Sequence, residues 1–348
     1  MSEPVSMPLG PVFLDVVGYS LTDDDRRRLL HPMAGGVIFF ARNFDSPAQI
    51  RELALAIRAL RTPRLLIAVD HEGGRVQRFR TGFTRIAPMA ALGRRWEHDP
   101  AAACADAEAV GALIGMELAA CGVDFSFTPV LDLDYGPSAV IGDRAFHREA
   151  PAVAELGASL MRGLRHAGVA AVGKHFPGQG FAAEDSHVAI PVDDRPLARI
   201  EAEDMLPFRA LIAQGLPAVM PAHVIYPQVD DRPAGFSRTW LQDILRGRLD
   251  FRGAIFSDDL SMEAASVAGD ALGRAQAALQ AGCDMALVCN RPDAAERILA
   301  GLEPWLPPSG WQARVQALYA HAQPMGLTAL GGDARWRAAR AVADALVA

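Results

Sequence analysis

Eight short apolar runs alternate with amphipathic segments along the chain. Runs this apolar are typical of parallel strands that are buried on both faces. Because strand and helix alternate eight times, the pattern predicts an α/β fold, a (β/α)8 TIM-type barrel. The runs are PVFLDVVG (11–18), GVIFFA (36–41), RLLIAVD (64–70), GVDFSFTPVLDL (122–133), VAAVGKHF (169–176), PAVMPAHVI (217–225), GAIFSDD (253–259) and DMALVCN (284–290).

Helix punctuation separates these runs. Ser46-Pro47 and Asp99-Pro100 each place an N-cap residue before a proline, and Gly122 and Gly168 follow helical segments as C-terminal stops. A doubly wound sheet is the alternative, but GYSLTDDD (18–25) is not the glycine-rich phosphate turn which that fold places after its first strand. We therefore expect one catalytic barrel domain over residues 1–348, with about 300–348 as peripheral C-terminal helices.

Composition and charge exclude several classes of protein. Hydrophobic residues make up 51% and charged residues 22% of the 348 positions, as in a globular protein. The net charge of −7 argues against nucleic-acid or anionic-membrane partners. The start lacks a secretory pattern, no apolar run reaches the ~20 residues of a membrane span, and the four cysteines show no C-x-x-C spacing. We expect a cytoplasmic protein with free, buried thiols.

Polar residues gather at the carboxyl ends of the predicted strands, where barrel enzymes have their active sites. Convergence of such residues from most of the strands is what a polar pocket requires. They are Asp70, Asp132, Lys174, His175, His223, Asp258, Asp259 and Asn290.

The stretch KHFPGQGFAAEDSH (174–187) allows several interpretations. His175, Asp185 and His187 could ligate a metal, but their spacing matches no familiar motif. Ser186 lacks the G-x-S-x-G elbow of a nucleophile, and PGQG lacks the G-K-[ST] ending of a phosphate loop. A solvated loop remains the plainest alternative.

A catalytic interpretation fits the same stretch. Asp185 and His187 are two positions apart, so in an extended segment their side chains share a side and the carboxylate can orient the imidazole. A histidine suits proton transfer near neutral pH. Pro177, Gly178 and Gly180 would let this loop open and close over a substrate.

Two further stretches carry candidate residues. Asp258 ends the seventh run and could be a nucleophile or an electrostatic stabiliser, although it or Asp259 could instead cap a following helix. Asp70 and Arg78 in DHEGGRVQRF (70–79) form a suitable grip for sugar hydroxyls, or an internal ion pair. Arg144 could bind substrate or brace a long loop.

Six motifs in series resemble the β-N-acetylhexosaminidases of glycoside hydrolase family 3, in the single-domain cytoplasmic branch that works in cell-wall recycling. The resemblance covers about residues 10–290. The motifs are VDHEGGRVQRF, FTPVLDL, IGDRAF, KHFPGQG followed by EDSH, MPAHVIY and IFSDDLSMEAA.

The resemblance implies a retaining hydrolase that removes terminal β-linked N-acetylglucosamine from anhydro-muropeptides, with a carbohydrate as its partner. Asp258 would be the nucleophile, and His187 the acid/base with Asp185 as its dyad partner. We expect a monomer that uses no cofactor and no metal. The residues that would hold the sugar are Asp70, Arg78, Arg144, Lys174 and His175.

One position departs from the family pattern, and two other functions stay open. The family usually has PGHG where this chain has PGQG, so Gln179 replaces a histidine and cannot transfer a proton. A glycoside phosphorylase is one alternative, because a neutral histidine would not repel phosphate as a carboxylate would. A non-catalytic sugar-binding barrel is the other.

Overall fold

Each of the eight apolar runs contains or overlaps a parallel strand in the computed structural model, which describes residues 4–136, 138, 140–182, 191–302 and 304–347. The strands are β2 (Val12–Leu14), β3 (Ala34–Phe39), β5 (Leu66–Val69), β8 (Phe125–Ser126), β9 (Val172–Phe176), β10 (Ala218–Pro221), β13 (Ala254–Ile255) and β14 (Ala286–Leu287). Hydrogen bonds arrange them in two parallel sheets, in the orders β14-β2-β3-β5-β8 and β13-β10-β9. The expected parallel α/β architecture is confirmed. Among the described residues, however, the eight strands are hydrogen-bonded as two sheets of five and three strands rather than as one continuous sheet.

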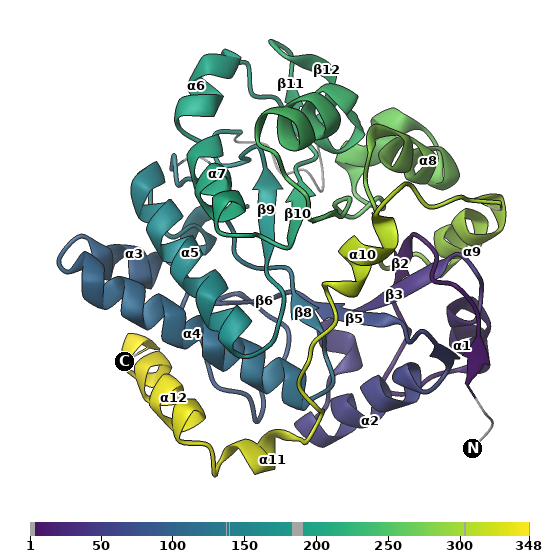
Figure 1. Ribbon diagram of the computed structural model, residues 1–348, viewed down its shortest axis with the longest axis horizontal. Helices are drawn as coiled ribbons and strands as arrows, with labels where there is room; N and C mark the ends of the chain where they lie inside the picture. The colour runs from purple at the N-terminus through teal and green to yellow at the C-terminus, as the bar shows by residue number, and fades with distance from the viewer. Residues whose placement is uncertain (1–3, 137, 139, 183–190, 303, 348) are drawn as a thin grey trace.

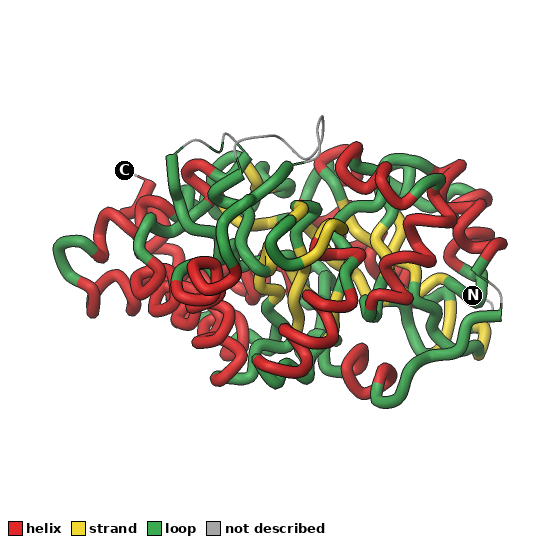
Figure 2. The backbone as a smooth tube through the Cα atoms, turned by 90° about the horizontal axis from the view of Figure 1, so that it is seen from above, coloured by secondary structure: helices red, strands yellow, loops and turns green. Residues whose placement is uncertain are grey.

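Isolated bridges lie beside the edges of the two sheets. Phe125 pairs with Ala170 and Val130 pairs with Lys174, beside β8 and β9. A further bridge joins Phe256 and Met285, beside β13 and β14. These strands lie in the middle of the molecule and the helices surround them (Figures 1 and 2).

The helices follow the punctuation that the sequence predicts. Ser46 accepts a hydrogen bond from Gln49 N at the start of α2, and Asp99 accepts one from Ala102 N at the start of α4. Gly122 and Gly168 have φ of 86° and 74°, a conformation that favours glycine, just after α4 and α5. The helices are α1 (Asp23–Leu29), α2 (Pro47–Arg58), α3 (Ala90–Trp96), α4 (Pro100–Ala120), α5 (Ala150–His166), α6 (Leu197–Ala202), α7 (Met205–Ala213), α8 (Ala271–Ala281), α9 (Pro292–Gly301), α10 (Trp311–Gln316), α11 (Leu327–Leu330) and α12 (Ala334–Val347).

Shorter elements complete the chain. The 3₁₀ helices are η1 (Ala41–Asn43), η2 (Gly142–Arg144), η3 (Ala234–Phe236) and η5 (Glu263–Ala268), and η4 (Thr239–Arg248) is a π-helix. The two-stranded pairs are β1 (Val5–Ser6) with β4 (Arg61–Thr62), β6 (His71–Gly73) with β7 (Val76–Gln77), and β11 (Ile225–Tyr226) with β12 (Asp230–Pro233).

A cluster of aromatic rings connects residues of the two sheets. Phe256 contacts Phe13, Phe125 and Phe127 with ring centroids 5.3–5.5 Å apart, and all four side chains are buried. Gly36 makes room for this cluster, since a Cβ there would lie 2.2 Å from the Phe13 ring. Tilted and edge-on rings pack densely here and hold the strand ends in fixed positions.

The segment after residue 300 packs against the outside of this core. Arg314 of α10 forms an ion pair with Asp284 at 2.6 Å, and Trp336 of α12 donates a hydrogen bond to Glu117 of α4 at 3.0 Å. No helix in the described ranges is long and apolar enough to cross a membrane. The cysteines are free thiols as expected, although Cys104 is only partly buried.

Candidate active site

A cavity of about 800 Å³ opens at the carboxyl ends of the strands. All the predicted site residues that the structure describes line it. They are Asp70, Arg78, Arg144, Lys174, His175 and Asp258. Asp185 and His187 lie outside the described residues. The structure thus brings together residues that are up to 188 positions apart in the sequence, from Asp70 to Asp258.

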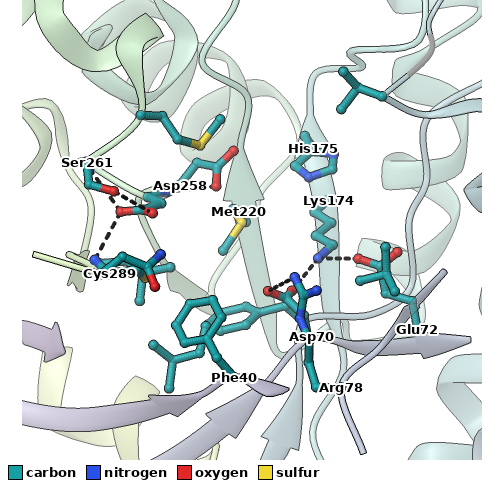
Figure 3. Close-up of a pocket in the computed structure, with 18 of the residues that line it drawn as sticks. Phe40, Asp70, Glu72, Arg78, Lys174, His175, Met220, Asp258, Ser261 and Cys289 are labelled. Carbon is teal, nitrogen blue, oxygen red and sulfur yellow. Dashed lines mark hydrogen bonds and ion pairs between the residues drawn. The ribbon is translucent and has the colours of Figure 1, made fainter. Parts of the chain in front are cut away.

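Lys174 is the centre of an ion-pair cluster on one wall of the cavity. It extends from β9, its side chain is 3% exposed, and its Nζ lies 2.8 Å from Asp70 Oδ1 and 2.6 Å from Glu72 Oε1 (Figure 3). Burial alone would lower the pKa of Lys174, but the two carboxylates raise it above its usual value. The ammonium is therefore charged at neutral pH and can donate to a ligand.

Glu72 was not predicted, and it links the cations of this wall. Its carboxylate accepts two hydrogen bonds from Arg144, from Nε and from Nη2, each of 2.8 Å, besides the contact with Lys174. Burial would raise the pKa of Glu72, but Lys174 and Arg144 hold it well below the usual value. The sequence offered one signal for this residue, since Glu72 follows Asp70 by two positions in the DHEGGRVQRF motif. In the structure it lies on β6 of the β6–β7 hairpin.

Arg144 and Arg78 each pair with a carboxylate and also line the cavity, so the structure is compatible with both roles that the sequence left open. Arg144 braces its loop through Glu72 and also lines the cavity. Arg78 Nη2 lies 3.8 Å from Asp70 Oδ2, which makes an internal ion pair, and the guanidinium also faces the cavity (Figure 3). Arg144 is thus held in place before any ligand binds, which reduces the entropy lost on binding.

His175 is held by a second buried carboxylate. Its Nδ1 lies 2.7 Å from Asp132 Oδ2, and Asp132 is fully buried at the end of the fourth predicted run. The sequence placed Asp132 among the polar strand ends but gave it no role. Because the carboxylate accepts at Nδ1, it fixes the imidazole so that Nε2 is available to the cavity.

Asp258 faces the cluster from the end of β13. In the view of Figure 3, Met220 lies between Asp258 and Lys174. Asp258 Oδ1 accepts a hydrogen bond of 2.8 Å from the Asp259 amide. Burial alone would raise the pKa of Asp258, but His223, His175, the Asp259 amide and Lys174 together hold it below the usual value. The carboxylate is ionised at neutral pH, as a nucleophile requires.

Asp259 has a different environment from its neighbour. It accepts hydrogen bonds from Ser261 N at 2.9 Å, Ser261 Oγ at 2.8 Å and Cys289 N at 3.1 Å, so it ties the turn after β13 to the end of β14. Burial raises its pKa to about 6. Asp259 therefore holds the turn through Ser261, but it does not cap the following helix as the sequence suggested, because the N-cap residue of the 3₁₀ helix η5 is Met262 and makes no side-chain cap hydrogen bond.

Two glycines that the sequence assigned to loop movement have another reason to be present. A Cβ at Gly178 would lie 2.6 Å from Asp204 Cβ, and one at Gly180 would lie 1.8 Å from Leu133 O. Both positions therefore require glycine for close packing.

The buried charge of Glu72 makes a first testable prediction. Glu72→Gln leaves Arg144 without a counter-ion, so we expect unfolding free energy to fall by about 3 kcal/mol, as when one partner of a buried pair is removed. We also expect KM for the substrate to rise by about tenfold, because the cations of the cavity wall lose their shared carboxylate. Urea unfolding and steady-state kinetics measure the two effects.

Glu97→Gln is the matched control, because Glu97 pairs with His147 at 3.1 Å while its side chain is 55% exposed. A surface pair contributes about 0–1 kcal/mol, so this variant should differ little from the wild type. Equal behaviour of the two variants would contradict a role of Glu72 in holding the cations.

Comparison with known proteins identifies the family of the chain. The model of the family described as "Glycosyl hydrolase family 3 N terminal domain" matches residues 12–306. A β-hexosaminidase of Methylobacillus flagellatus is 58% identical over 327 residues, which cover 94% of this chain and 93% of that protein.

Solved structures agree as well. The structure of NagZ from Neisseria gonorrhoeae in complex with N-trifluoroacetyl-D-glucosamine has a TM-score of 0.93 and 47% identity, and covers 99% of this chain and 100% of that one. A structure of the same protein in complex with zinc ion has a TM-score of 0.92, 46% identity and the same coverage. Because the family model matches residues 12–306 and the 58% identity extends over 94% of the chain, the chain belongs to glycosyl hydrolase family 3, among its β-hexosaminidases.

Proposed function

We propose that this enzyme is a retaining glycosidase that removes terminal β-linked N-acetylglucosamine from anhydro-muropeptides in cytoplasmic peptidoglycan recycling. The observation that carries the proposal is the ionised Asp258 carboxylate, which lies in the same cavity as a preorganised set of sugar-binding cations and carboxylates. The relative from Neisseria gonorrhoeae was solved with an N-acylated glucosamine, which supports the class of sugar.

The reaction would proceed in two displacements. Asp258 attacks the anomeric carbon, and the bond to the leaving group breaks as His187 protonates the departing oxygen. His187 then removes a proton from water, which attacks the anomeric carbon and releases Asp258. Asp185 would orient the imidazole of His187, and Asp70, Arg78, Arg144, Lys174 and His175 would hold the sugar.

The test of this function compares substrates. Wild-type enzyme should hydrolyse a chromogenic β-N-acetylglucosaminide, should act at least tenfold more slowly on the matching glucoside, and should release N-acetylglucosamine from an anhydro-muropeptide. If the enzyme releases the free sugar without phosphate but a sugar phosphate in its presence, it is a phosphorylase. Binding of the sugar without turnover would indicate the non-catalytic alternative.

We also propose that the two sheets close into one eight-stranded barrel. The bridges between Phe125 and Ala170 and between Phe256 and Met285 lie where the outer strands of one sheet meet those of the other. A closed ring would direct all eight strand ends towards one mouth.

Removal of metal ions tests whether the proposed mechanism needs a metal. The proposed steps use only protein acids and bases. Activity should therefore be unchanged after dialysis against EDTA, measured before and after addition of Zn²⁺. Loss of activity on chelation, with recovery on adding Zn²⁺, would favour the metal interpretation of His175 and His187.

A further inference from the structure

Gln179 lies in a segment of backbone that is fixed on both sides. The Gly178 carbonyl accepts a hydrogen bond of 2.7 Å from the Tyr226 hydroxyl. Gly178 packs against Asp204 and Gly180 against the Leu133 carbonyl, closely enough that neither has room for a Cβ. The position of Gln179 is therefore set by the fold.

The same residue is connected to the sugar-holding histidine. The Gln179 amide donates a hydrogen bond of 2.7 Å to Asp132 Oδ1, while Asp132 Oδ2 lies 2.7 Å from His175 Nδ1. One carboxylate thus fixes both residues relative to each other. Gln179 is 3% exposed and lines the cavity together with His175 and Asp258.

The Gln179 carboxamide has an acceptor that the described part of the chain does not satisfy. Its Oε1 is buried and has no hydrogen-bond partner among the described residues. Leaving such an acceptor unpaired costs about 1–3 kcal/mol. Lys174, Glu72, Arg144 and His175 on the same cavity wall all have partners in the protein.

We propose that Gln179 is a substrate-binding residue whose Oε1 accepts a hydrogen bond from the bound sugar, either from a ring hydroxyl or from the acetamido N–H. This inference rests on the proposed function, since it takes N-acetylglucosamine as the ligand. A sugar offers several hydrogen-bond donors, and a site with a buried, otherwise unpaired acceptor discriminates against an analogue that lacks the matching donor. Gln179 would therefore contribute to specificity and would take no part in proton transfer.

The test couples changes in the enzyme with changes in the substrate. Wild type and Gln179→Leu are assayed with an aryl β-N-acetylglucosaminide and with its 3-deoxy, 4-deoxy, 6-deoxy and N-methylacetamido analogues. We expect one analogue to lower kcat/KM of the wild type about tenfold and that of Gln179→Leu less than twofold. The other analogues should affect both enzymes equally.

Two control variants distinguish the loss of the Gln179 acceptor from effects of substitution on folding. Gln179→Met keeps the length of the side chain without the acceptor and should repeat the result if Gln179→Leu is poorly folded. Gln214→Leu, on the exposed end of α7, should behave as wild type with every analogue.

Two outcomes would count against different claims. If every analogue lowers kcat/KM of wild type and both Gln179 variants by the same factor, Gln179 bonds the protein and not the sugar, and this inference is wrong. If the wild type does not turn over the unmodified N-acetylglucosaminide, the proposed function itself is wrong.

Discussion

Asp258→Ala should lower the turnover of an aryl β-N-acetylglucosaminide by ~10³-fold or more, because the proposed covalent path would disappear with its nucleophile. The loss should be equally large for good and poor leaving groups, since no substrate can form the glycosyl-enzyme. Steady-state kinetics over a series of aryl leaving groups measures this.

Rescue by azide distinguishes the loss of a nucleophile from a folding defect in Asp258→Ala. A small anion can enter the space left by the Asp258 side chain and attack the anomeric carbon in a single displacement. Azide should therefore restore turnover of an activated substrate by Asp258→Ala and yield the α-glycosyl azide, whose configuration is inverted. The product is identified by NMR.

Asp259→Ala is the matched comparison within the pair. Asp259 holds the turn through Ser261 and Cys289, so its loss should reduce activity through misplacement of Asp258, without rescue by azide. Near-normal activity of Asp258→Ala would remove Asp258 from the mechanism. Azide rescue of Asp259→Ala alone would reverse the two assignments.

His187→Ala should slow the two chemical steps unequally. A substrate whose leaving group departs without protonation needs little help from a general acid, so formation of the glycosyl-enzyme should remain fast. Its hydrolysis loses the general base and should slow by roughly 10²-fold or more. The covalent species should therefore accumulate.

A pre-steady-state burst with 2,4-dinitrophenyl β-N-acetylglucosaminide measures this, with an unactivated substrate beside it. Asp185→Ala should show a weaker form of the same pattern, because in the proposed mechanism Asp185 would only orient the imidazole and stabilise its charged form. His166→Ala is the control, since His166 is exposed at the end of α5. Unchanged rates of His187→Ala on both substrates would assign the proton transfer to another residue.

The strands and helices were predictable because their signals are local. Eight apolar runs gave eight parallel strands, and Ser46 and Asp99 cap helices where the sequence places them. Each signal depends on a few neighbouring residues, so burial of the runs and hydrogen bonding at the caps follow from the sequence pattern alone.

The set of cavity residues was also largely predictable, because parallel strands direct their carboxyl ends to one side. Asp70, Lys174, His175 and Asp258 line one cavity for this reason. The placement of Asp185 and His187 stays a prediction, since both lie outside the described residues.

Only the tertiary structure decided how these residues are held. Glu72 and Asp132 act through partners that are 72 and 43 positions away, Arg144 and His175, and no local pattern specifies such pairs. The different environments of Asp258 and Asp259 likewise depend on contacts with β14 and on the cations of the opposite wall. A sequence motif thus determines which groups reach the cavity, whereas burial and long-range contacts determine which of them are charged, fixed in place or free to meet a substrate.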